Sequence, residues 1–184
     1  MSSFPQVDFQ INWRPFFLNP AQDAPKEGED KLVMYNRKFG AQRIAQMLPR
    51  MTQVFAGLGI TYSMGGRTGN TIDSHRLITW AGRQGLAQQD RVVEALFDAY
   101  FSREQFLGDR AVLLDAAAKA GLDPAAAAAV VDDPNALLAE VREEVARYGR
   151  GVTGVPFFII AGSVRLSGAL PPEEFEDAIT SVLR

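Results

Sequence analysis

Hydrophobic and polar residues alternate strictly near the start of the chain. The apolar positions are Val7, Phe9, Ile11 and Trp13, and the polar residues Asp8, Gln10, Asn12 and Arg14 follow them one by one. This period of two predicts a strand over 7–13 with one buried face. Pro15 ends it, and a polar loop with proline and glycine follows at 19–30.

From residue 30 to residue 149 the hydrophobic period is helical. In 41–58 the apolar residues are Ile44, Met47, Leu48, Met51, Val54, Phe55 and Leu58. Their spacing predicts an amphipathic helix in which Pro49 is a kink or a start. Helix starts are predicted after Asp30, Asp109 and Asp123, because aspartate caps the first turn. Further helical segments lie at 71–85, 88–102 and 134–149.

The last part of the chain changes period again. The apolar runs at 157–160 and 164–166 are separated by a short turn sequence, which predicts a β-hairpin. A helix follows, opened by two prolines with Glu173 and Glu174 in its first turn. The order is therefore strand, six or seven helices, hairpin and helix, which indicates a small α/β sheet with a helical insertion.

The amino-acid composition excludes several kinds of catalytic and metal site. The 184 residues contain no cysteine and one histidine, His75, which excludes disulfides, thiolate nucleophiles and metal sites built on cysteine or several histidines. The net charge of −3 argues against a strongly basic surface for nucleic acid or lipid, while leaving a local patch open. The chain has no apolar run of about 18 residues and no secretory signal at its start, so the cytoplasm is the expected compartment.

Four segments, taken in order, resemble the DsbA family of thioredoxin-fold proteins. They are WRPFFLNP at 13–20, NTIDSHRLITWA at 70–81, EALFDAYF at 94–101, and GVTGVPFFII with GSVRLSGALPPEEF at 151–175. The resemblance is strongest to the cytoplasmic FrnE-like branch, which is similar to 2-hydroxychromene-2-carboxylate isomerases and kappa-class glutathione transferases. It implies a thioredoxin-like α/β fold in a single domain over 1–184. The sheet portion would lie at 1–20 and 150–184, and a mainly helical insertion at 28–149.

The resemblance also implies a binding edge at Val155 and Pro156. In the family this dipeptide has a cis peptide bond and presents the backbone to a bound peptide or thiol substrate. The residues alone leave open a trans proline that simply starts a strand. His75 is a further candidate for substrate contact, although a packed helical histidine is the favoured interpretation. Asn70 is interpreted as a helix cap, and Asp73 with Arg76 as a surface pair.

One departure from the family affects the expected function. Its members carry a strand and a helix before the strand that matches 7–13, and a Cys-x-x-Cys motif or a serine opens that helix. Six residues cannot hold these elements, so an N-terminally truncated fold is expected and Ser2 and Ser3 are poor matches for the serine. Three arrangements remain open: a fragment of a longer oxidoreductase, a strand supplied by a partner or second copy, or pairing of 7–13 with the hairpin.

The family activity implied is thiol–disulfide exchange, which requires a thiolate. The chain itself is therefore predicted to be redox-inactive, with no catalytic residue, metal or cofactor, and whether it is an enzyme stays open. One alternative is a binding or assembly module that uses the Val155–Pro156 edge. Another is a glutathione-dependent transferase or isomerase relative. The expected partners are a peptide or thiol substrate, a second copy or a strand donor, and neither nucleic acid nor membrane.

Overall fold

The computed structural model describes residues 3–18 and 27–184. The predictions about Ser2 and about most of the loop at 19–30 therefore fall outside the described residues. The helices are α1 (Lys31–Phe39), α2 (Ala41–Gly57), α3 (Ile72–Gln84), α4 (Leu86–Phe101), α5 (Arg110–Lys119), α6 (Pro124–Asp132), α7 (Leu138–Tyr148) and α8 (Pro172–Val182). The strands are β1 (Glu29–Asp30), β2 (Arg67–Thr68), β3 (Phe157–Ile160) and β4 (Val164–Ser167). None of the described helices is long and apolar enough to cross a membrane.

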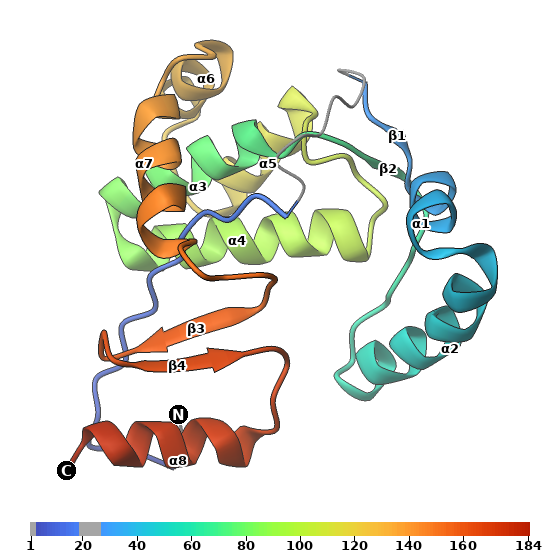
Figure 1. The fold of residues 1–184 in the computed structure, drawn as a ribbon. Helices are drawn as coiled ribbons and strands as arrows, with labels where there is room; N and C mark the ends of the chain where they lie inside the picture. The colour runs from blue at the N-terminus through green and yellow to red at the C-terminus, as the bar shows by residue number, and fades with distance from the viewer. Residues whose placement is uncertain (1–2, 19–26) are drawn as a thin grey trace.

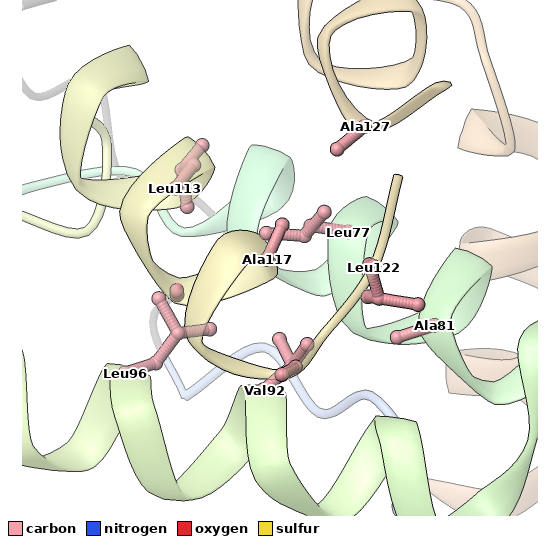
Figure 2. Packing of buried hydrophobic residues seen from close by; sticks show 10 residues of the cluster. Leu77, Ala81, Val92, Leu96, Leu113, Ala117, Leu122 and Ala127 are labelled. Atoms are coloured by element: carbon pink, nitrogen blue, oxygen red, sulfur yellow. The ribbon is translucent and has the colours of Figure 1, made fainter. Parts of the chain in front are cut away.

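The main hydrophobic core lies between helices α3, α4, α5 and α6. Its buried members are Leu77, Ala81, Val92, Leu96, Leu113, Ala116, Ala117, Ala120, Leu122 and Ala127. Figure 2 shows leucine and valine side chains from α3, α4 and α5 pointing into a common space against the alanines. The small alanines of α5 and α6 let these helices approach closely, so the insertion carries its own core.

Local sequence signals explain where most of these helices begin. Asp30, Asp109 and Asp123 each accept a hydrogen bond from a backbone N–H in the first turn of α1, α5 and α6. Pro124 takes the first helical position, where its missing N–H costs nothing. Asn70 accepts from the N–H of Ile72 at the start of α3, which fits its predicted capping role. Helix α2 runs through Pro49 without a break in its assignment.

The hairpin and α8 form a separate layer on one side of the helical block (Figure 1). Strands β3 and β4 pair antiparallel, with Phe157 opposite Ser167 and Ile160 opposite Val164, so the predicted hairpin is confirmed. Helix α8 packs on β3, where the ring of Phe158 meets that of Phe175 edge to face at 4.8 Å. A second antiparallel pair, β1 with β2, is only two residues long on each strand, and the sequence pattern did not predict it.

The predicted strand at 7–13 is wrong. This segment carries no strand assignment, and no described strand pairs with it. A side chain takes the place of a neighbouring strand at one residue: the buried Gln89 amide accepts from the Trp13 N–H at 3.0 Å and donates to the Trp13 carbonyl at 3.1 Å. The Trp13 indole also donates to Asp90 at 2.8 Å. Side chains of α4 therefore hold the segment where a backbone ladder was expected.

Arg76 links α3 to the end of α6 and to the turn before α7. The predicted ion pair with Asp73 is confirmed at 2.9 Å. The side chain of Arg76 is 1% exposed, so the interpretation of the pair as a surface pair is wrong for this residue. The guanidinium donates to the carbonyls of Val130, Val131, Asp133 and Ala136, at 2.6 to 3.2 Å, and to the Asp73 carboxylate. These carbonyls belong to the end of α6 and the turn before α7, where a helix leaves acceptors unsatisfied and favours a cation.

We predict that Arg76→Leu lowers the free energy of unfolding by about 3–5 kcal/mol, because it leaves several buried carbonyls without donors. Arg76→Lys should fall between Leu and wild type, because one ammonium cannot reproduce the planar fork of the guanidinium. Urea unfolding followed by circular dichroism measures both. Arg142→Leu, at an exposed position of α7, is the control and should change stability by about 0.5 kcal/mol or less. Equal losses of stability at Arg76 and Arg142 would contradict the stabilising role of the Arg76 hydrogen bonds.

Candidate functional site

The loop between α7 and β3 leads directly to the predicted binding edge. The Val155–Pro156 peptide bond is cis, the isomer that the family resemblance predicts. The Pro156 carbonyl accepts from the Gly168 N–H at 2.9 Å, which extends the β3–β4 pairing by one residue beyond the assigned strands. Val155 and Pro156 are both exposed, and Val155 keeps 52% of its surface accessible. The dipeptide is therefore open to solvent at the entry to β3.

The hydrogen-bond alternation of the hairpin fixes which backbone groups of β3 face outward. In an antiparallel pair, residues that exchange hydrogen bonds alternate with residues that do not. Since Pro156 bonds to Gly168, the register assigns the even positions Phe158 and Ile160 to β4. The N–H and C=O groups of Val155, Phe157 and Ile159 then point to the opposite edge. No described strand pairs with that edge.

The side chains along the open edge are apolar and uncharged. Val155, Phe158 and Ile159 are among the exposed large hydrophobic residues of the protein. Positions 151–164 contain no charged residue, so nothing there repels an approaching strand. Exposed edges without charges, bulges or covering loops are prone to pair with other chains. We call the backbone and side chains of Val155, Phe157 and Ile159 the β3 edge.

The structure places His75 among neighbours from the N-terminal segment and its own helix. Its Nδ1 donates to the Thr71 carbonyl at 2.6 Å, and the ring meets Phe17 edge to face at 5.4 Å. Burial lowers the pKa of His75, partly offset by hydrogen bonds to the carbonyls of Thr71 and Phe16. Burial therefore favours the neutral ring, and none of these contacts involves Val155 or Pro156. A role for His75 in substrate binding stays a prediction.

A second buried cluster of polar groups joins α1 to α4. Lys31 is 1% exposed, donates to the Tyr100 carbonyl at 2.9 Å, and lies 3.7 Å from the centroid of the Tyr100 ring. Burial lowers the pKa of Lys31 and raises the pKa of Tyr100 to about 12. The lysine is stabilised by a carbonyl and a ring face. We interpret the cluster as the anchor of α1, since it joins Lys31 in the first turn of α1 to Tyr100 of α4.

The sequence singled out Val155 and Pro156 but missed Phe157 and Ile159. Their contribution is backbone hydrogen bonding, which no side-chain motif reveals. The sequence could have indicated them through the hairpin register: once the turn is placed, the alternation of hydrogen bonds shows which residues of β3 face outward. Over 3–18 and 27–184, no group of three or more histidine or acidic side chains is arranged to hold a metal ion.

We predict that the amide protons of Phe157 and Ile159 exchange with solvent faster than those of Phe158 and Ile160. The first pair points to the open edge, and the second is held in the β3–β4 ladder. Hydrogen–deuterium exchange followed by NMR resolves the four residues. Protection of Phe157 and Ile159 equal to that of their neighbours would mean that the edge is paired.

The free energy of unfolding should fall as the pH drops below about 6.5, the ordinary pKa of histidine. Because the pKa of His75 is lowered in the folded state, the unfolded chain binds more protons in this window, between the ordinary value near 6.5 and the folded pKa. Stability from this residue is present above that window and lost below it. His75→Gln should flatten the pH dependence there, as measured by urea unfolding. An unchanged slope would contradict the assignment, since the chain has no other histidine.

A search of curated proteins finds no match to this chain. A family model described as "DSBA-like thioredoxin domain" matches residues 2–180. The match takes in the extended N-terminal segment, the helical insertion, the β3–β4 hairpin and nearly all of α8. The chain therefore belongs to the DSBA-like thioredoxin domain family, and its fold is the thioredoxin-like fold of that family with a helical insertion.

Proposed function

We propose that this chain is a redox-inactive member of the DsbA-like family that binds an extended segment of another polypeptide at the β3 edge. The observation that carries the proposal is the run of outward-facing backbone groups from Val155 to Ile159. Among the described residues this run has no strand partner, it carries no charge, and Val155 and Ile159 are exposed. The proposal joins the redox-inactive and the binding-module hypotheses, because the same edge serves both.

The chemistry of the family gives the first half of the argument. Thiol–disulfide exchange begins when a thiolate attacks a disulfide sulfur and forms a mixed disulfide. The chain contains no cysteine, so it can form no such intermediate. What it retains from the family is the substrate-side loop. Binding without exchange is the activity that these residues support.

The geometry of the edge gives the second half. A strand that joins β3 would exchange backbone hydrogen bonds with Val155, Phe157 and Ile159, the mode known as β-augmentation. Backbone bonds supply affinity with little sequence demand, while exposed Val155 and Ile159 favour apolar side chains at alternate positions. The partner is therefore an extended, largely apolar segment from a peptide, another protein or a second copy.

Within the family, we assign the chain to the FrnE-like branch and to the cytoplasm. The support is the ordered set of segments from WRPFFLNP to GSVRLSGALPPEEF, together with the cis Val155–Pro156 bond. The assignment places the polypeptide partner in the same compartment.

We predict that the purified chain does not accelerate insulin reduction above the rate of dithiothreitol alone. The assay follows turbidity as the insulin chains separate, with a Cys-x-x-Cys thioredoxin as the positive control. Turnover by the cysteine-free chain would overturn the redox-inactive part of the proposal and leave the binding part to be judged separately.

The binding part predicts that an alternating valine–threonine peptide shifts and protects the amide resonances of Phe157 and Ile159. The matched control is the same peptide N-methylated at every residue, which removes the backbone donors of both strand edges and should abolish the effect. Ile159→Pro removes one outward N–H without taking a donor from the β3–β4 ladder, so it should fold and bind the peptide more weakly. Equal binding of both peptides would contradict β-augmentation.

A further inference from the structure

The segment that carries α1 and α2 differs in charge from the rest of the protein. Residues 31–72 contain no aspartate or glutamate. Their basic residues are Lys31, Arg37, Lys38, Arg43, Arg50 and Arg67. The rest of the chain has thirteen basic and twenty-two acidic residues, a net charge of −9. A chain that is acidic as a whole therefore has one strongly basic part.

Helix α2 projects from the body on the side away from α7 (Figure 1), and α1 is its main helical contact. One side of α2 faces the protein, where Ile44 is buried and the ring of Phe55 lies 4.7 Å from that of Tyr62 and 6.0 Å from that of Phe101. The attachment buries or half-buries most of the apolar face that the sequence predicts, and it leaves Val54 and Leu58 exposed.

A neighbouring stripe runs along α2 and ends at Leu58, directly after the helix; it faces solvent except at Met47, which is half-buried. Its members follow one another at helical spacing, and they are Arg43, Met47, Arg50, Val54 and Leu58. Val54 is 52% and Leu58 is 72% exposed, and both arginines are exposed as well. We call these five residues the α2 outer stripe. It is basic toward the start of the helix and apolar toward its end.

The arginines of the stripe are available for an anionic partner. Arg37 of α1 is paired with Glu29, and Lys31 is buried. Arg43 lies 5.9 Å from the centroid of the Phe39 ring. Among the residues that the structure describes, neither Arg43 nor Arg50 forms an ion pair with an acidic side chain.

We propose that the α2 outer stripe docks on the surface of an anionic lipid bilayer, lying in the headgroup region rather than crossing it. Amphipathic helices with basic and apolar residues and no acidic ones bind such surfaces by burying the apolar side chains while arginines reach the phosphates. The expectation of no membrane partner came from the net charge, which conceals the charge separation along the chain. The net charge of −9 elsewhere would turn the α2 side toward the lipid.

A bilayer fits the stripe better than an acidic protein helix. Side chains of a helical partner dock into grooves or pockets, whereas Val54 and Leu58 stand exposed on a projecting helix. A pocket of about 160 Å³ lies elsewhere, at Asn12, Arg14 and Gln89. A fluid headgroup layer needs no pocket. This inference does not depend on the binding function of the β3 edge.

Vesicle co-sedimentation of the full chain tests the proposal. Vesicles of phosphatidylcholine with phosphatidylglycerol should bind it, vesicles of phosphatidylcholine alone should bind it much less, and added salt should weaken the binding. The variant Arg43→Gln with Arg50→Gln should lower the partition coefficient on the order of tenfold or more. Val54→Ser with Leu58→Ser should also lower it. The matched controls are Arg142→Gln and Ile11→Ser, at exposed positions outside the stripe, and they should bind like wild type.

Absent binding, equal binding to both kinds of vesicle, or stripe variants that bind like wild type would each overturn the proposal. Analytical ultracentrifugation of the same variants adds a second readout. If they lose self-association while vesicle binding is absent, the stripe is a protein interface and the lipid proposal is wrong. These results leave the proposed binding at the β3 edge untouched, because the peptide titration tests it separately.

Discussion

The helical block depends on the buried guanidinium of Arg76. A charge taken out of water is costly unless donors and acceptors surround it in good geometry, and here the carbonyls at the end of α6 and in the turn before α7 supply the acceptors. The same bonds satisfy backbone groups that a helix end leaves open. Because α3 also contacts α4, α5, α6 and α7, this one side chain sets the path of the chain between two helices of the core.

A second contact that positions the chain is the one between the Gln89 side chain and the backbone of Trp13, where a neighbouring strand was expected. The Gln89 amide bonds to both backbone groups of Trp13, which is the pairing that a neighbouring strand would make at one residue. The indole of Trp13 then packs edge to face on Phe97, with ring centroids 5.9 Å apart. Helix α4 therefore positions the N-terminal segment, through the contacts of Gln89 and Phe97 with Trp13.

Sequence reasoning predicted the elements whose signals are local. Asp109, Asp123 and Pro124 mark helix starts through short-range hydrogen bonds and fixed dihedrals, and the structure bears them out. The strand at 7–13 failed because alternation does not show whether a partner strand is present, and Ile11 on the predicted buried face is 44% exposed. Arg76 was misread because the carbonyls that bind it lie more than fifty residues away. At the candidate site, Val155 and Pro156 came from a motif, whereas the roles of Phe157 and Ile159 required the hairpin register.

The division of the protein into layers has a consequence for its cooperativity. Nearly all fully buried side chains belong to the helical part, while within 150–184 only Ala178 is buried among the hydrophobic residues. Regions with few buried contacts open at lower free energy than the core to which they are attached. We therefore expect the hairpin with α8 to open at lower free energy than the helical core. A ligand that binds the hairpin and α8 would raise the free energy needed to open them, and it would leave the free energy of unfolding of the helical core unchanged.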